Sequence, residues 1–185
     1  MLNIPVINKS DSNFNDFDFI IISSKDFETE IYEELILKLT ANKIGRLYNL
    51  DHEKIFNEIY SRNHWKSSES HSGKGSEIQQ VQTLVQQLPF IFKEFKIKKL
   101  LDLPCGDFNW MQRVLPADVK YIGADIVENL VTQNQQNYAS KNIRFTHLNL
   151  ISSKLPEADL LLCRDCLVHF SLKDIKLALN NIRQS

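Results

Sequence analysis

Four short runs rich in leucine and isoleucine alternate with helical patterns in the later part of the chain. The expected strands are Lys99–Leu103, Lys120–Ala124, Ile143–Leu148 and Ala158–Cys163. Apolar strands separated by helices of about ten residues are typical of a parallel sheet covered by helices on both faces. We therefore predict a three-layer α/β fold, with its ligand site beyond the carboxyl ends of the strands.

Capping patterns predict where two helices begin. Gln79 follows Ser76 by three residues and Asp174 follows Ser171 by three, a spacing that is typical of a helix start at the serine. We expect Pro89 to bend or end the first of these helices. Helices are expected from about Asn109, over Val127–Tyr138 and over Leu172–Arg183.

The part of the chain before Gly75 is organised differently. Its expected elements are a strand around Phe17–Ile22, a helix with Ile31, Leu35 and Leu39 on one face, a helix over about Asp51–Tyr60, and a loop over Asn63–Ser76. We assign residues 1–50 to an N-terminal extension or cap and residues 51–185 to the main domain.

The composition is that of a soluble domain with one continuous core, at 185 residues, 43% hydrophobic and 24% charged. Lysine plus arginine number 22 against 23 for aspartate plus glutamate, so we expect no basic face for nucleic acid. Apolar runs such as Phe19–Ile22 are far shorter than the ~20 residues of a membrane span. The odd count of 3 cysteines and the lack of an export signal favour reduced thiols and a cytoplasmic setting.

Carboxylates follow the first two expected strands. Asp102, Gly106 and Asp107 lie in the turn after the first strand, and Asp125 follows the second. Asp125 comes about 20 residues after Asp102, the interval at which a carboxylate meets a ribose in nucleoside-binding βαβ units. A turn with one glycine and two carboxylates would repel a pyrophosphate but suits an ammonium and a sulfonium. These features favour S-adenosylmethionine (SAM) over a dinucleotide.

Four segments, in this order, resemble the first four motifs of class I SAM-dependent methyltransferases. They read LLDLPCGDFNWM, YIGADIVENLV, NIRFTHLNL and ADLLLCRDCLVHFS. An upstream element is similar to that of a bacterial subgroup of this family, and here it consists of Trp65, Glu69, Ser70, Ser72, Gly73, Gly75 and Ser76. The resemblance covers roughly Ile55 to the C-terminus and implies a Rossmann-like sheet.

The resemblance also implies a set of SAM-binding residues. The methionine moiety would be lined by Asp102, Cys105, Gly106 and Asp107. The ribose would be held by Asp125 and the adenine flanked by Asn149 and Leu150. The set is completed by Ile126, Arg164 and Pro104, the last of which stands where a glycine is common.

Asp165 and His169 are the candidate catalytic residues. They follow the fourth strand, next to where the methyl group should project, and a four-residue spacing places them on one side of a helical segment. Methyl transfer to a hydroxyl requires an aligned acceptor and the removal of its proton. The alternative is that Asp165 caps the following turn and His169 is a wall residue of the site.

The upstream element is a candidate lid or substrate-binding segment, with Trp65, Glu69, Ser70, His71, Gly73, Gly75 and Ser76 as its members. Trp65 and His71 would close over the cofactor or the acceptor, with the glycines and serines as hinges. Alternatively, Trp65 only anchors the loop on the core. Cys163, Cys166 and His169 offer three crowded ligands where a structural zinc site needs four, so we expect no metal.

These observations predict a SAM-dependent methyltransferase domain, truncated or minimal after the fourth strand and its helix. Its acceptor is expected to be a small molecule or a saccharide, methylated on oxygen. Two alternatives stay open: a SAM-binding module without turnover, and a nicotinamide-dependent oxidoreductase, which the single-glycine turn disfavours. An apolar strand at a sheet edge favours association, so we expect a second copy, a partner chain or residues 1–50 to cover it.

Overall fold

The computed structural model describes residues 18, 20–22, 27–40, 43–46 and 51–185. The chain divides into two compact units, Met1–Leu50 and Asp51–Ser185. Each unit has core clusters of its own.

The first unit is a small α/β arrangement. Its elements are β1 (Ile20–Ile22), α1 (Glu28–Ile36) and β2 (Ile44–Arg46), with β1 and β2 paired in parallel. The helix buries Leu35 against the two strands. Of the strand expected around Phe17–Ile22, Phe17 and Phe19 lie outside the described residues, and the sequence pattern does not predict β2.

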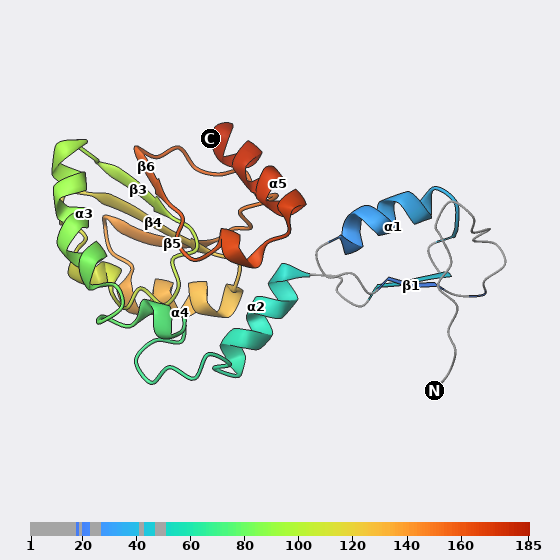
Figure 1. The fold of residues 1–185 in the computed structure, drawn as a ribbon. Helices are drawn as coiled ribbons and strands as arrows, with labels where there is room; N and C mark the ends of the chain where they lie inside the picture. The colour runs from blue at the N-terminus through green and yellow to red at the C-terminus, as the bar shows by residue number, and fades with distance from the viewer. Residues whose placement is uncertain (1–17, 19, 23–26, 41–42, 47–50) are drawn as a thin grey trace. The chain divides into compact units, whose positions relative to one another are not determined.

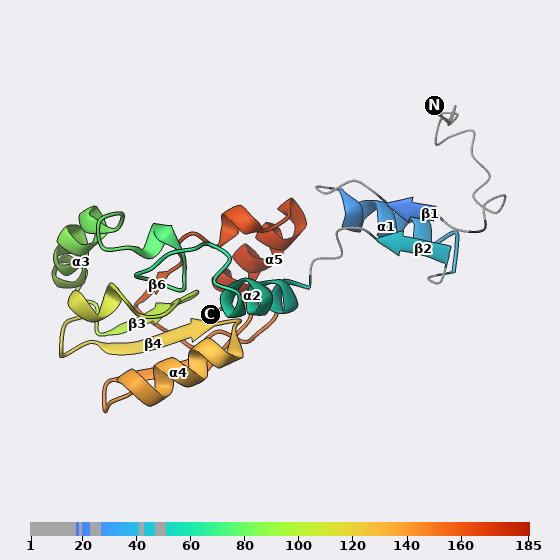
Figure 2. The same ribbon diagram turned by 90° about the horizontal axis from the view of Figure 1, so that it is seen from below.

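The second unit is built around a parallel sheet (Figure 1 and Figure 2). Its strands are β3 (Lys99–Asp102), β4 (Lys120–Asp125), β5 (Ile143–His147) and β6 (Leu160–Leu162). Its helices are α2 (His52–Ser61), α3 (Gln82–Glu94), α4 (Glu128–Tyr138) and α5 (Leu172–Arg183). The strand order is β5-β4-β3-β6, and every neighbouring pair is parallel. The predicted α/β fold and its four strands are confirmed.

Helices cover both faces of this sheet. Leu100 of β3 packs with Leu88 of α3 and Val131 of α4 in one core cluster. The next residue, Leu101, packs with Ala178 of α5 in a second cluster. Because successive strand side chains point to opposite faces, the sheet lies between α3 and α4 on one side and α5 on the other. The predicted three-layer αβα arrangement is therefore confirmed.

The sheet ends at β6. This strand pairs with β3 and has no second strand neighbour among the residues described. The expected strand near Ile22 is present in the first unit as β1, which pairs with β2. Among the residues described, the main sheet thus has four strands.

The two capping predictions have different outcomes. Ser171 caps α5, and its Oγ accepts a hydrogen bond from the Asp174 backbone N–H at 3.1 Å. The helix predicted to begin at Ser76 is wrong, because α3 begins only at Gln82. The Ile78 N–H donates instead to the Glu69 carboxylate at 2.9 Å, which holds this stretch outside the helix. The helix continues past Pro89 to Glu94, so the proline does not end it.

The helix predicted from about Asn109 is also wrong, since a single 3₁₀ turn, η5 (Met111–Arg113), stands there. The Asn109 N–H donates to the Asp107 side chain, which competes with helical hydrogen bonds. Phe108 has a positive φ of 60° and its ring is buried among Tyr121, Tyr138 and Phe145. Burial of this ring and the Asx turn together prevent a regular helix.

Candidate functional site

A cavity of about 410 Å³ lies at the carboxyl ends of the strands, where the fold predicts a ligand site. Its walls come from the strand ends, the loop before α3, and α2. Most of the predicted site residues line it: Trp65, His71, Gly73, Gly75, Ser76, Asp102, Pro104, Cys105, Gly106, Asp125, Ile126, Asn149, Leu150, Arg164, Asp165 and His169.

Three predicted site residues are not among the residues that line the cavity. The Asp107 carboxylate accepts a hydrogen bond from the His71 backbone N–H at 2.9 Å. Glu69 accepts from the side chain of Asn109 and from the backbone of Ile78, and these hydrogen bonds lower the pKa of its carboxyl. Ser70 is buried. All three hold the upstream loop in place rather than face the cavity.

Asp102 is the carboxylate on the cavity floor, at the end of β3. It is 3% exposed, and the Tyr121 hydroxyl donates to its Oδ2 at 2.7 Å. Burial raises the pKa of Asp102 to about 7, although the hydrogen bond from Tyr121 opposes the rise. A buried carboxylate of this kind favours a cationic ligand, which would stabilise its charged form.

Asp125, the last residue of β4, is buried beside it. The Gly106 backbone N–H donates to Oδ2 and the Val127 N–H donates to Oδ1, each at 3.1 Å. Burial raises the pKa of Asp125, while the backbone hydrogen bonds lower it. Each carboxylate oxygen keeps a further lone pair for a ligand hydroxyl.

The turn after β3 is held close to the upstream loop at Gly106. This glycine has a φ of 57°, and a Cβ at this position would lie 2.3 Å from Ser72 Oγ. The Asp107 N–H donates to the same Oγ at 2.8 Å. The Gly106 carbonyl accepts a hydrogen bond at 2.7 Å from the buried Asn134 of α4, which the sequence reasoning missed. Only glycine fits this left-handed, crowded position.

Arg164 joins the upstream loop to the segment after β6. Its guanidinium donates to the Gly75 carbonyl and lies 2.7 Å from Asp165 Oδ2. The Asp165 carboxylate is thus paired with a cation. His169 lies in η6 (Leu167–His169), and its ring makes no hydrogen bond within the described part of the chain.

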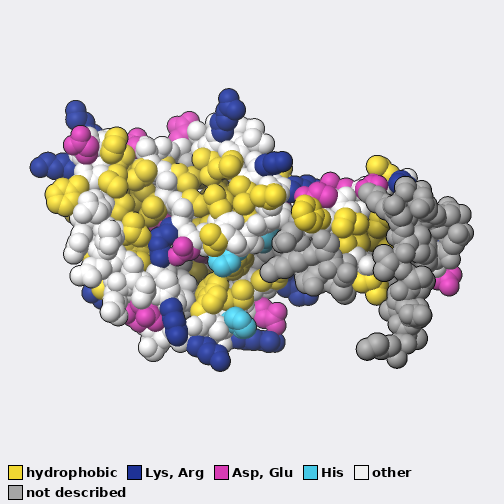
Figure 3. Space-filling model, viewed as in Figure 1, with side chains coloured by type: hydrophobic (Ala, Val, Ile, Leu, Met, Phe, Trp, Pro, Cys, Tyr) yellow, Lys and Arg dark blue, Asp and Glu magenta, His cyan; other side chains and the backbone are white. Residues whose placement is uncertain are grey.

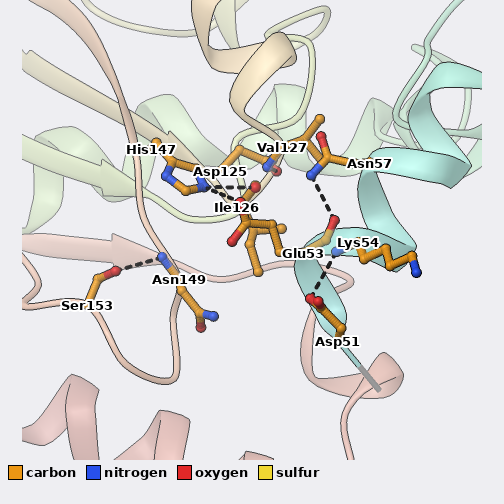
Figure 4. A network of polar contacts seen from close by, with 10 residues as sticks. All are labelled: Asp51, Glu53, Lys54, Asn57, Asp125, Ile126, Val127, His147, Asn149 and Ser153. Atoms are coloured by element: carbon orange, nitrogen blue, oxygen red, sulfur yellow. Dashed lines mark hydrogen bonds and ion pairs between the residues drawn. The ribbon is translucent and has the colours of Figure 1, made fainter. Parts of the chain in front are cut away.

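Polar contacts near Ile126 and Asn149 join α2 to the sheet (Figure 4). The His147 Nε2 lies 3.0 Å from the Ile126 carbonyl and 3.6 Å from the Glu53 carboxylate. Asn149 donates its backbone N–H to Ser153 Oγ and accepts from the Ile151 N–H through its side chain. These contacts fix the wall that Ile126 and Asn149 form.

Ser72 of the upstream element also lines the cavity, together with residues that the sequence reasoning did not assign: Phe56, Tyr60, Lys74, Leu103, Trp110, Val127, Leu130, Leu148, Cys166, Val168 and Phe170. Phe56 and Tyr60 are one helical turn apart on α2. The spacing of apolar residues on α2 is a signal that could have identified its cavity-facing side.

Neither a metal-binding cluster nor a membrane-spanning helix is found among the described residues. No group of three or more histidine, cysteine, aspartate or glutamate side chains in the described ranges is arranged to hold a metal ion. Within the same ranges, every helix is too short or too polar to cross a bilayer.

The comparisons with known proteins bear on the fold. Among solved structures, the chain is similar to human N-acetylserotonin methyltransferase in complex with SAM, with a TM-score of 0.51 and 16% sequence identity. The likeness covers 84% of this chain and 44% of that one, so this chain spans less than half of that structure's length. No family model matches the sequence, and no curated protein does. The fold is therefore Rossmann-like and similar to the fold of that SAM-bound methyltransferase.

Proposed function

We propose that this protein is a SAM-dependent methyltransferase that methylates an oxygen of a small molecule or a saccharide. One observation carries the proposal: two buried carboxylates, Asp102 and Asp125, stand at the ends of adjacent parallel strands in one cavity. This pair suits a cationic nucleoside and disfavours a pyrophosphate. The likeness in fold to a SAM-bound methyltransferase supports the same ligand.

The residues of the cavity fit SAM by their chemistry. Asp125 would accept hydrogen bonds from the ribose hydroxyls, and Asp102 would face the positively charged part of the methionine moiety. Asn149 and Leu150 would flank the adenine, since they line the wall beyond β5. When bound, SAM supplies a methyl group on a positively charged sulfur, which becomes a neutral thioether on transfer.

The chain's own part in the reaction is alignment of the acceptor and removal of its proton. Asp165 is paired with Arg164 at 2.7 Å, so its carboxylate is already engaged in an ion pair. The His169 imidazole lines the cavity and is not engaged in a hydrogen bond within the described residues. His169 is therefore our candidate for the group that accepts the hydroxyl proton and releases it to solvent.

Calorimetric titration of the full chain with SAM and with S-adenosylhomocysteine tests the cofactor without knowledge of the acceptor. We expect micromolar binding of both, and loss of more than about tenfold in affinity, or ~1.4 kcal/mol, in Asp125→Ala. A folded protein that binds neither ligand would contradict the proposal. NADH fluorescence enhancement on addition of the protein would instead favour an oxidoreductase.

A second candidate function is SAM binding without turnover. The position of Asp102 and Asp125 in the cavity is compatible with it, because these carboxylates would bind the cofactor whether or not an acceptor is turned over. Methyl transfer from radiolabelled SAM to any acceptor separates the two candidates. Tight SAM binding with no transfer to a broad acceptor panel would support the second one.

A further inference from the structure

The cavity has an aromatic rim in addition to its acidic floor. The rim consists of Phe56, Trp65, Val168, His169 and Phe170. The His169 ring meets Phe56 nearly edge-on, with centroids 5.7 Å apart, and its centroid lies 6.4 Å from that of Trp65. The segment η6, which is distant in the sequence from α2 and the loop that follows α2, therefore brings its ring to the same place as theirs.

The rim exposes apolar surface around a concave site. Val168 is 79% exposed although it lines the cavity, and α2 buries none of its residues despite its amphipathic pattern. Hydrophobic and histidine side chains gather on this face of the second unit (Figure 3). Exposed apolar side chains around a hollow gain free energy when an apolar molecule fills it.

Polar contacts, rather than core packing, hold α2 beside the cavity. His52 Nε2 lies 3.1 Å from the Asp174 carboxylate of α5. The Tyr60 hydroxyl donates to Gln133 of α4 at 2.7 Å. These two contacts hold the helix near both of its ends and leave Phe56, between them, at the rim.

Several other polar side chains line the cavity. Arg164 and Asp165 form an ion pair, and His71 packs on Tyr60 with ring centroids 5.5 Å apart. The side chains of His71, Lys74, Ser76 and His169 also line the cavity, and among the residues described none of the four makes a side-chain hydrogen bond or ion pair. A saccharide presents many hydroxyls and requires several directional partners, whereas the five residues of the rim offer only the His169 ring and the Trp65 indole N–H.

We propose that the acceptor is a planar aromatic compound with a ring hydroxyl, held against Phe56, Trp65 and His169. Its ring would pack in an offset or edge-on arrangement, as aromatic pairs do. This inference rests on the proposed function, because the cofactor at Asp102 and Asp125 leaves the rim to the acceptor. Methyl transfer would form the bond from methyl carbon to ring oxygen and break the carbon–sulfur bond, whose electrons stay on sulfur. The hydroxyl proton passes to His169 and then to solvent.

The test is calorimetric titration of the full chain with 2-naphthol and with methyl α-glucopyranoside, each with and without saturating S-adenosylhomocysteine. We expect 2-naphthol to bind at least about tenfold more tightly than the glucoside. Phe56→Ala should weaken 2-naphthol binding about tenfold, and Phe56→Leu, which keeps apolar volume but lacks the ring, should weaken it less. Both variants should bind S-adenosylhomocysteine within about twofold of the parent protein. Phe90→Ala is the matched control, because Phe90 is an exposed aromatic residue of α3.

The outcomes separate this inference from the proposed function. Binding of S-adenosylhomocysteine with no binding of 2-naphthol, or with tighter binding of the glucoside, would overturn the aromatic acceptor and leave the cofactor assignment intact. Binding of 2-naphthol that Phe56→Ala weakens, without any binding of S-adenosylhomocysteine, would support the aromatic site and contradict the cofactor. Equal effects of Phe56→Ala and Phe90→Ala on 2-naphthol would also overturn the inference.

Discussion

At the scale of single residues, the raised pKa of Asp102 makes cofactor binding depend on pH. Burial raises this pKa to about 7, so the carboxyl is largely neutral at pH 6 and charged at pH 8. We expect the affinity for SAM to rise about tenfold between these pH values, because only the charged form attracts the cation. Calorimetry at both pH values measures this. Asp102→Asn should abolish the pH dependence of the affinity. Asp118→Asn is the control and should keep it, because Asp118 is exposed and forms an ion pair with Lys98.

The Asp102 carboxyl also affects the stability of the fold, with a pH dependence opposite to that of cofactor affinity. A carboxyl whose pKa is higher in the folded protein stabilises the fold at low pH, and this stabilisation is lost as the pH rises through about 7. Asp102→Asn should therefore raise the melting temperature of the ligand-free protein at pH 8 and leave it nearly unchanged at pH 4. Thermal unfolding followed by circular dichroism measures both. A lower melting temperature of the variant at pH 8 would show that the Tyr121 hydrogen bond outweighs burial of the charge.

At the scale of elements, the turn after β3 depends on Gly106. Alanine there would have to adopt a φ of 57° and would place Cβ against Ser72 Oγ. We expect Gly106→Ala to lower the free energy of unfolding by about 1–3 kcal/mol and to weaken S-adenosylhomocysteine binding. Urea denaturation and calorimetry measure the two effects.

The matched control is Gly75→Ala. A Cβ at Gly75 would lie 3.2 Å from the end of the Asp165 side chain, a contact that a small rotation can relieve. Its effect on unfolding should be clearly smaller. Equal destabilisation by the two alanines would contradict the special role of the Gly106 conformation.

The N-terminus of α5 depends on Ser171. Its hydroxyl accepts from the Asp174 N–H at 3.1 Å and donates to the Asp174 carboxylate at 2.8 Å. Ser171→Ala should lower the free energy of unfolding by about 1 kcal/mol, because it leaves a helix N–H without this partner. Urea denaturation checks the value. Ser68→Ala, at an exposed loop position, should change it by less than about 0.5 kcal/mol.

At the scale of the whole molecule, the two core clusters of the sheet draw only on residues of the second unit. We therefore expect the fragment Asp51–Ser185 to unfold cooperatively and to bind S-adenosylhomocysteine within about twofold of the full chain. Calorimetric unfolding and titration test this. A fragment that shows no cooperative transition would mean that residues 1–50 are needed for the fold.

Self-association of the fragment Asp51–Ser185 is a second property to measure, because β6 has a free edge in it. An apolar edge strand with one neighbour is prone to association, so we expect the fragment to self-associate at micromolar concentration. Analytical ultracentrifugation measures its mass. A monodisperse monomer would contradict the hypothesis that residues 1–50 or a second copy must cover this edge.

Local patterns in the sequence determined the strands, the last helix and the strand-end carboxylates. Apolar runs and the capping serine at Ser171 depend on neighbours a few residues away, so they can be identified without a structure. Asp102 and Asp125 were placed in one site because the ends of parallel strands meet at one edge of a sheet.

Only the tertiary structure decided which polar residues face the cavity and which hold the loops. Glu69 accepts from Ile78, a contact that replaces the helix start expected at Ser76, and Asp107 accepts from His71 of the upstream loop. The place of Phe56 on the cavity rim likewise depends on contacts of α2 with α4 and α5. Such contacts join residues that are far apart in the chain, so no local period or spacing encodes them. The sequence alone therefore predicts the sheet and the acidic floor, and the fold decides the rim.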